Sequence, residues 1–260
     1  MATKAKTGRK KAAAQKKTAQ KKTAQKNRSD GGAEFRGFGP HTLGFLAELS
    51  NHNNKEWFDA HKQRYEDEVR EPARAFIRAM APKLKKISAA LVADDRKVGG
   101  SLMRVYRDVR FSKDKTPYKT NVGIQFRHER GKDVHAPGCY VHLGLDGCFL
   151  GMGMWHPDAP SLAAIRKVIA EEPKKWQRVI GDAKLNAVWR MGGESLKRPP
   201  RGFDAEHPLI EELKRKDHIL VCDLEVDEAE SDQLVALCAE RFTAGKRHIL
   251  ALCDAIGVPF

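Results

Sequence analysis

The sequence predicts an α+β fold in which a mainly antiparallel sheet of about five strands is covered by N-terminal and C-terminal helices. Apolar residues recur at helical spacing up to about residue 91. From about Val98 their spacing has a period of two, and after Trp155 it is helical again. Strands and helices rarely alternate along the chain, which argues against a parallel sheet. The 260 residues are enough to bury a core without a disulfide or metal site.

Three helices are expected before the sheet. The first spans about residues 40–49, and Asn53 or Asn54 is a candidate N-cap for the second. Pro72 can begin the third helix, and Pro82 should kink or break it, because proline removes a backbone hydrogen bond. The second helix carries a stripe that is typical of a core-facing surface: Trp57, Phe58, His61, Tyr65 and Val69.

Four strands are expected next, near residues 101–107, 121–128, 139–145 and 148–155. Asp146-Gly147, between the last two, is a strong signal for a two-residue hairpin turn. That turn would place Leu143 opposite Leu150 and His142 opposite Gly151. Because side chains alternate along a strand, one face of the hairpin is then apolar and the other carries Tyr140, His142, Phe149, Trp155 and three glycines.

The C-terminal third returns to helices. One helix should follow Ser161, and another should begin at Pro173 and stop at Gly181. Residues 192–208 are rich in glycine and proline, so they should form a long ordered loop or a lid. The remaining elements are expected as a short helix near 208–215, a strand at 219–226, and helices at about 228–243 and 245–256.

Positive charge is concentrated at the N-terminus. Residues 1–33 hold eleven lysine or arginine residues and one acidic residue, so they contribute +10 of the net charge of +14. They contain no apolar face to bury, so we expect a disordered tail, followed by one domain over residues 34–260. The tail is either an electrostatic arm that binds nucleic acid without sequence preference or a solubilising extension.

Cysteine content and hydropathy narrow the class of protein. The five cysteines are odd in number and no pair has CxxC spacing, so neither a disulfide framework nor a zinc site is indicated. No apolar run is long enough for a membrane span. No apolar stretch follows the basic start, so a signal peptide is not expected. We therefore expect a cytoplasmic protein without a membrane partner, a bound metal or a cofactor. A mitochondrial transit peptide is a minor alternative, and the lysine-rich composition argues against it.

The stretch from Arg104 to Asn121 is the best candidate for a functional site. It is strongly polar and basic, yet apolar strands precede and follow it. Arginine and lysine side chains close together suit a phosphate or carboxylate group. The ligand-binding candidates in this stretch are Arg104, Tyr106, Arg107, Asp108, Arg110, Lys113, Lys115, Tyr118 and Lys119.

The polar face of the sheet should complete this site. Alternation along 101–107 directs Arg104 and Tyr106 to that face, and Met103 and Val105 into the core. We expect a concave surface lined by the arginines and by Tyr140, His142 and Trp155, since glycines in a strand often mark a place where a ligand comes close. The alternative is that a loop, such as 192–208, packs over the glycines.

Four segments resemble the DUF2461 proteins, a widespread family of unknown function. They are Asn53–Phe58, Arg107–Asn121, Pro137–Leu143 and Lys197–Asp204. The resemblance spans about residues 35–257 and implies one domain. It implies no activity, cofactor or catalytic residue.

Three functions remain open from the sequence. The first is binding of a phosphate-bearing or other anionic small molecule, or of nucleic acid. The second is an enzyme that acts on a small anionic substrate, with Asp108, His142 or Tyr118 handling protons. The third is a structural protein in which residues 104–121 form an internally paired charge network.

Overall fold

An antiparallel sheet is the centre of the computed structural model, which describes residues 34–130 and 137–260. Within these ranges the sheet has six strands in the order β1-β2-β3-β4-β6-β5. The predicted α+β class is confirmed, and the strand number is close to the five expected. The strands are β1 (Leu91–Val92), β2 (Asn121–His128), β3 (Gly138–Gly144), β4 (Gly147–Met154), β5 (Arg190–Gly192) and β6 (His218–Leu224).

The strand predicted at 101–107 is wrong. That segment makes only isolated bridges, between Leu102 and Ile124 and between Tyr106 and Tyr118. Strict alternation therefore does not hold there: Val105 is buried as predicted, but Met103 lies at the edge of a cavity on the open face of the sheet. The other four predicted strands are present, and two short strands that were not predicted, β1 and β5, bring the total to six; both have little apolar pattern of their own.

The predicted hairpin register is also wrong, by two residues. Leu145 and Asp146 form the turn, so that Gly144 pairs with Gly147 and His142 pairs with Phe149. The turn thus lies one residue earlier than Asp146-Gly147 suggests. Gly147 is the first residue after the turn, and its φ of 124° is one that a residue with a side chain rarely adopts, so the glycine is required there and not within the turn. A shift of two residues leaves every side chain on its predicted face, because strands have a period of two.

The helices before the sheet follow the predicted pattern with one exception. They are α2 (Gly39–Asn51), α3 (Lys55–Ala60), α4 (Lys62–Tyr65), the π-helical turn η1 (Glu66–Arg70) and α5 (Glu71–Ile87). The side chain of Asn54 caps α3 by accepting a hydrogen bond from the Trp57 amide, as expected. Pro82 does not break α5: its ring is exposed, and the buried face that includes Phe76 and Met80 holds the helix on the sheet.

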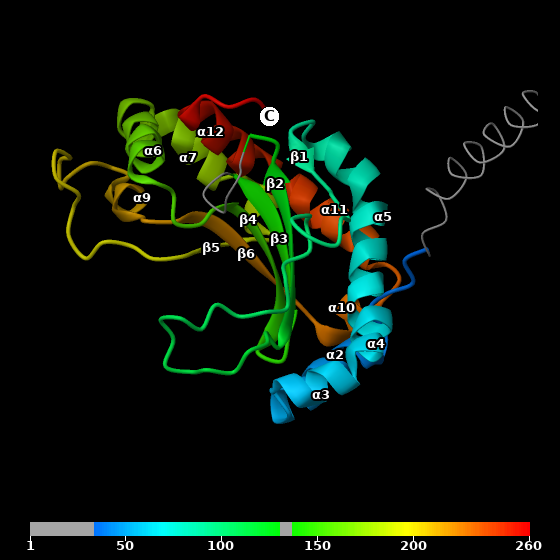
Figure 1. The fold of residues 1–260 in the computed structure, drawn as a ribbon. Coiled ribbons are helices and arrows are strands. Elements are labelled where there is room, and N and C mark those ends of the chain that lie inside the picture. Colours follow the sequence, from blue (N-terminus) through cyan, green and yellow to red (C-terminus); the bar gives the residue numbers. More distant parts are fainter. Residues whose placement is uncertain (1–33, 131–136) are drawn as a thin grey trace, which may run out of the picture. The chain divides into compact units, whose positions relative to one another are not determined.

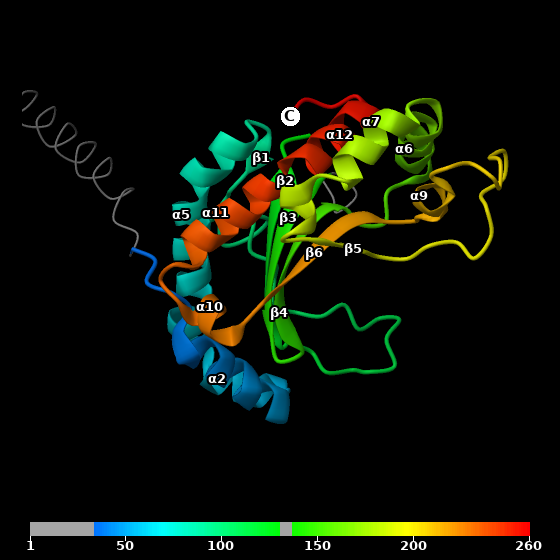
Figure 2. The ribbon, with the colours of Figure 1, turned by 180° about the vertical axis from the view of Figure 1, so that it is seen from behind.

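The helices after the sheet complete the fold. They are α6 (Ala159–Glu171), α7 (Pro173–Ile180), α8 (Ala183–Asn186), α9 (Ile210–Lys214), α10 (Val226–Glu230), α11 (Leu234–Ala244) and α12 (Lys246–Ile256). Figure 2 shows α11 and α12 following one another, with α6 and α7 beside α12. None of the described helices is both long enough and apolar enough to cross a bilayer.

The two faces of the sheet have different surroundings. In Figure 1, α5 and α11 lie on one side of the sheet, and the loop between Arg107 and Pro117 extends on the other. The covered face supplies the main core, with fully buried side chains such as Ile124, Phe126 and Leu150. The opposite face is therefore left open over much of β2, β3 and β4, and it is the face that the sequence predicts to be polar.

A smaller core beneath α6, α7 and α12 contains two buried histidines. His218 and His248 lie against Trp176, with ring centroids 5.8 Å and 6.2 Å away. His248 Nε2 is 3.2 Å from the His218 carbonyl oxygen, whereas both ring nitrogens of His218 have no hydrogen-bond partner among the described residues. Burial lowers the pKa of both rings, so both are neutral in the folded protein.

This arrangement predicts that stability falls as the pH drops below about 6.5, the ordinary pKa of histidine in an unfolded chain. The unfolded state then binds protons that the folded state excludes, so each histidine removes about 1.4 kcal/mol per pH unit until the pH reaches its lowered folded pKa. His218→Leu should unfold like the parent at pH 7.5 and lose less stability at pH 5.5. Urea titrations at pH 7.5, 6.5 and 5.5 measure this, with exposed His41→Gln as the control. Equal pH dependence in His218→Leu and the parent would contradict the explanation.

Candidate functional site

The polar stretch 104–121 forms a loop whose base is fixed to the rest of the fold. The Arg107 amide donates to the Pro117 carbonyl over 2.9 Å, and the Lys119 amide donates to Val105 over 2.7 Å. The Asn53 side chain bonds both the amide and the carbonyl of Tyr118, at 3.0 Å each. These contacts hold Tyr118 and Lys119 rigidly while the loop between them and Arg107 extends into solvent (Figure 1).

Several charges in the loop are paired with one another. Arg110 donates to Asp108 over 2.7 Å, and Arg107 donates to Asp114 and Thr116. These hydrogen bonds to arginine hold the pKa of Asp108 and of Asp114 at about 2. An exposed carboxylate with so low a pKa is a weak base at neutral pH, so Asp108 is a poor candidate for proton transfer.

The other candidates in the loop are spread out. Lys115 Nζ donates to the Val109 carbonyl over 2.9 Å, and Lys113 and Tyr106 are exposed. The Tyr118 ring is buried and stacks on Phe58 with centroids 4.1 Å apart. The structure therefore does not gather the six cations of the stretch at one point. Much of the loop is paired as the structural alternative anticipates.

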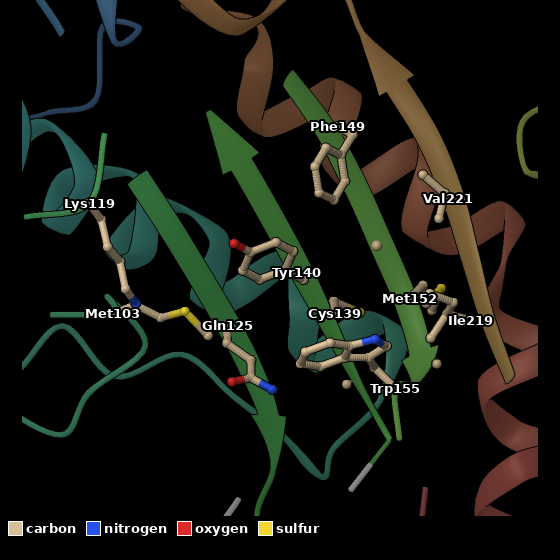
Figure 3. Close-up of a pocket in the computed structure, with 13 residues that line it drawn as sticks. Met103, Lys119, Gln125, Cys139, Tyr140, Phe149, Met152, Trp155, Ile219 and Val221 are labelled. Atoms are coloured by element: carbon tan, nitrogen blue, oxygen red, sulfur yellow. The ribbon is translucent and has the colours of Figure 1, made fainter. Parts of the chain in front are cut away.

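A cavity of about 490 Å³ lies on the open face of the sheet, where the sequence predicts a concave surface (Figure 3). Its walls are mainly apolar and aromatic, and it contains no arginine. No residue of the loop 193–208, which is described throughout, lines it. The lining consists of Met103, Lys119, Gln125, Gly138, Cys139, Tyr140, Phe149, Gly151, Met152, Gly153, Trp155, Ile219 and Val221.

Glycines form part of the cavity floor. A Cβ atom on Gly151 would be in ordinary van der Waals contact with the Tyr140 side chain, at 3.5 Å and 3.8 Å, so a side chain could be added there without a clash at Cβ. Gly153 is glycine for a different reason: its φ is 127°, and a Cβ atom would lie 2.2 Å from the His218 carbonyl oxygen. The first glycine leaves the cavity floor without a side chain, and the second lets β4 approach β6.

Lys119 is the cation that the structure places in the cavity. It also lines a second, polar cleft of about 370 Å³ beside the loop, together with Ser50, Asn53, Arg107, Asp114, Thr116, Tyr118, Thr120 and Asn121. Burial lowers the pKa of Lys119, and the charge of Arg104 lowers it further. Among the described residues, no carboxylate pairs with its ammonium group. Lys119 is thus a partly buried cation without a counter-charge, between an apolar cavity and a polar cleft.

Tyr140 and His142 follow one another on the open face of β3. The Tyr140 hydroxyl lies 3.2 Å from His142 Nδ1, and His142 Nε2 lies 3.1 Å from Asp146 Oδ1. His142 is buried and stacks on Phe149 with centroids 4.5 Å apart, so it lies beside the cavity and does not line it. Burial raises the pKa of Tyr140 to about 12, with a further contribution from the charge of Asp146.

Trp155 forms the wall at the end of β4, and Figure 3 shows its ring on the same face of the sheet as Gln125 and Tyr140. The next residue, His156, has a φ of 47°, and its ring lies tilted against the indole with centroids 4.3 Å apart. Asp217 fixes this turn: its fully buried carboxylate accepts hydrogen bonds from the amides of His156 and Glu194, at 2.6 Å and 2.8 Å.

Of the residues that the sequence singled out, Lys119, Tyr140 and Trp155 line the cavity, and His142 supports Tyr140 from behind. Sequence reasoning assigned Met103 to the core and missed Ile219 and Val221. Ile219 and Val221 pair with Gly153 and Gly151, so they could be found only with the knowledge that β6 lies beside β4. Within residues 34–130 and 137–260, no group of three His, Cys, Asp or Glu side chains is placed to hold a metal ion.

Comparison with known proteins identifies the family and no function. No curated protein and no solved structure matches the chain. The family described as "Conserved hypothetical protein (DUF2461)" matches residues 41–249, which include β1 to β6 and the whole of the cavity and cleft. The chain therefore belongs to the DUF2461 family.

Proposed function

We propose that the protein binds an amphipathic anion, with the apolar or aromatic part of the ligand in the sheet cavity and its charged group at Lys119. The observation that carries this proposal is the position of Lys119, which lines both the apolar cavity and the polar cleft without a carboxylate partner in the described part of the chain. An ammonium group that has lost hydration and gained no counter-charge is costly. An anionic ligand would supply that charge and restore its pKa.

The cavity walls fit the body of such a ligand. Tyr140, Phe149 and Trp155 offer ring faces and edges, and Met103 offers an adaptable thioether. The volume of about 490 Å³ is in the range of small-molecule sites. The amide of Gln125 is the polar side chain on the floor that can orient a ligand through hydrogen bonds.

The cleft fits the charged and hydrogen-bonding part. Its hydroxyl and amide groups come from Ser50, Thr120 and Asn121, and Arg107 adds a second cation that is already shared with Asp114. A phosphate group suits this mixture, because lysine acts on it as a point charge while hydroxyls and amides bind its remaining oxygens. The ligand class that we favour is therefore a phosphate-bearing aromatic or apolar molecule.

Replacing Lys119 tests the charge. Lys119→Met keeps the length of the side chain and removes the ammonium group, so the affinity for 1-naphthyl phosphate should fall about 10-fold to 100-fold, as for the loss of a charged hydrogen bond. Isothermal calorimetry measures the affinity. Lys113→Met, on the exposed part of the loop, is the matched control and should bind like the parent. Equal affinity of Lys119→Met and the parent would remove Lys119 from the site.

A larger side chain on the floor of the sheet cavity tests whether the ligand binds there. Gly151→Val adds a branched side chain to the cavity floor beside Tyr140, without a clash at Cβ and without requiring an unfavourable φ. Binding of 1-naphthyl phosphate should be lost, while the melting temperature stays within a few degrees of the parent. Gly44→Val, at an open position on α2, is the control. If Gly151→Val folds and binds normally, the ligand does not occupy this cavity.

We also propose that residues 1–33, which lie outside the described residues, bind nucleic acid weakly and without sequence preference. Their eleven cations support the proposal, because lysines and arginines that neutralise phosphates release condensed counterions.

Salt dependence tests the role of the tail. The full chain should bind duplex DNA with a log affinity that falls with log salt at roughly −0.9 per phosphate contacted. A chain that begins at Glu34 should bind much more weakly and with a shallower slope. Fluorescence anisotropy at two salt concentrations measures both. Equal affinities for the two chains would exclude a part for the tail.

A further inference from the structure

We infer that Asp146, His142 and Tyr140 form a protonation switch that sets whether the Tyr140 hydroxyl donates to, or repels, an anion in the sheet cavity. This inference rests on the proposed function and specifies its regulation. The three groups form one continuous chain: Tyr140 lines the cavity, His142 lies 3.2 Å behind it, and Asp146 lies 3.1 Å beyond His142. The Asp146 side chain is 77% exposed, so the outer end of the chain meets solvent.

Two glycines show that the backbone is built around this chain of groups. A Cβ atom on Gly123 would lie 2.8 Å from the Tyr140 hydroxyl, and a Cβ atom on Gly144 would lie 2.4 Å from Asp146 Oδ1 and 2.8 Å from His142 Nε2. Neither glycine has a positive φ, so local backbone conformation does not require glycine there. The space that the two glycines leave is occupied by the polar ends of the three side chains.

The neutral state of His142 makes Tyr140 an acceptor toward the cavity. The Asp146 carboxylate only accepts hydrogen bonds, so it selects the tautomer with the proton on Nε2. Nδ1 then carries a lone pair, and the Tyr140 hydroxyl donates to it. The Asn121 amide, 3.5 Å from Nδ1, favours the same tautomer. In this state the tyrosine oxygen presents only lone pairs to the cavity, which an anion does not bind.

Protonation reverses the hydrogen bond. When both ring nitrogens carry protons, Nδ1 donates to the Tyr140 oxygen and Nε2 still donates to Asp146. The hydroxyl proton is then free to point into the cavity and donate to the ligand. An anion in the cavity therefore favours the protonated ring, so binding should take up a proton and strengthen as the pH falls.

The groups around His142 come from each neighbouring strand. Tyr140 is on β3, Asp146 is in the β3–β4 turn, Asn121 is on β2, and Phe149 of β4 stacks on the ring. In the described part of the chain, Asp146 is the charged group that contacts the ring. Lys119 also titrates and lines the cavity, so its contribution has to be separated from that of His142 by mutation.

The test uses 2-naphthalenesulfonate, because the charge of a sulfonate is constant between pH 5.5 and 8. The parent should bind up to about tenfold more tightly at pH 5.5 than at pH 8, as for one hydrogen bond to a charged group. Calorimetry at pH 7 in buffers with different ionisation enthalpies should show uptake of part of a proton.

Variants isolate the switch. His142→Gln should still bind, with an affinity near that of the parent at pH 8, and should lose both the proton uptake and the pH dependence of affinity that His142 causes. Tyr140→Phe keeps the ring that lines the cavity and lacks the hydroxyl, so it should bind more weakly than the parent at pH 5.5 and without proton uptake. His41→Gln, an exposed histidine, should retain both. Any remaining pH dependence in His142→Gln belongs to Lys119.

The outcomes are distinct. If the parent binds the probe with no proton uptake, or if His142→Gln keeps the full pH dependence of the parent, the switch is overturned while the binding site stands. If the parent does not bind the probe at any pH and Lys119→Met behaves identically, the proposed function fails, and the switch fails with it.

Discussion

The pleat of the antiparallel sheet is the constraint on which the rest of the structure depends. Helices cover one face of the sheet, so the residues of β2, β3 and β4 that point to it are buried, and all are apolar except His128 at the end of β2. The residues between them are released from that requirement and project to the opposite face. Tyr140, His142 and Gly151 lie there because Cys139, Val141 and Leu150 fill the core. The position of the candidate site therefore follows from the same alternation of side chains that forms the core.

Much of this could be predicted from the sequence, and the errors have physical causes. The order of periodicities predicted the α+β class, and the faces of the hairpin were correct although its register was wrong by two residues. The segment 101–107 misled because Met103 and Val105 alternate like a strand, yet only isolated bridges join it to its neighbours. Alternation describes a single segment, whereas pairing depends on residues far away in the chain. The contribution of β6 to the cavity lining could not be predicted for the same reason, because it depends on the pairing of β6 with β4.

The number of cations in a stretch does not predict which of them is available to a ligand. Six cations in one stretch suggested a common anion site, but a sequence does not show which of them are paired. Arg107 and Arg110 bind carboxylates of their own loop and remain near solvent, where such pairs contribute little stability. Lys119 looks like the others in the sequence. Its difference arises from the Asn53 clamp on Tyr118 and from the fold of β2, which hold it against an apolar cavity.

Asp217 has a consequence for how the site can diversify. Its carboxylate joins three stretches of chain, since it precedes β6 and binds the amides of His156 after β4 and of Glu194 after β5. The frame around the cavity is thus secured by backbone hydrogen bonds that do not involve the identity of the wall side chains. Trp155, Ile219 and Val221 can be exchanged for side chains of other size and polarity while that frame stays in place. The size and polarity of the cavity can therefore change without a change in the fold that surrounds it.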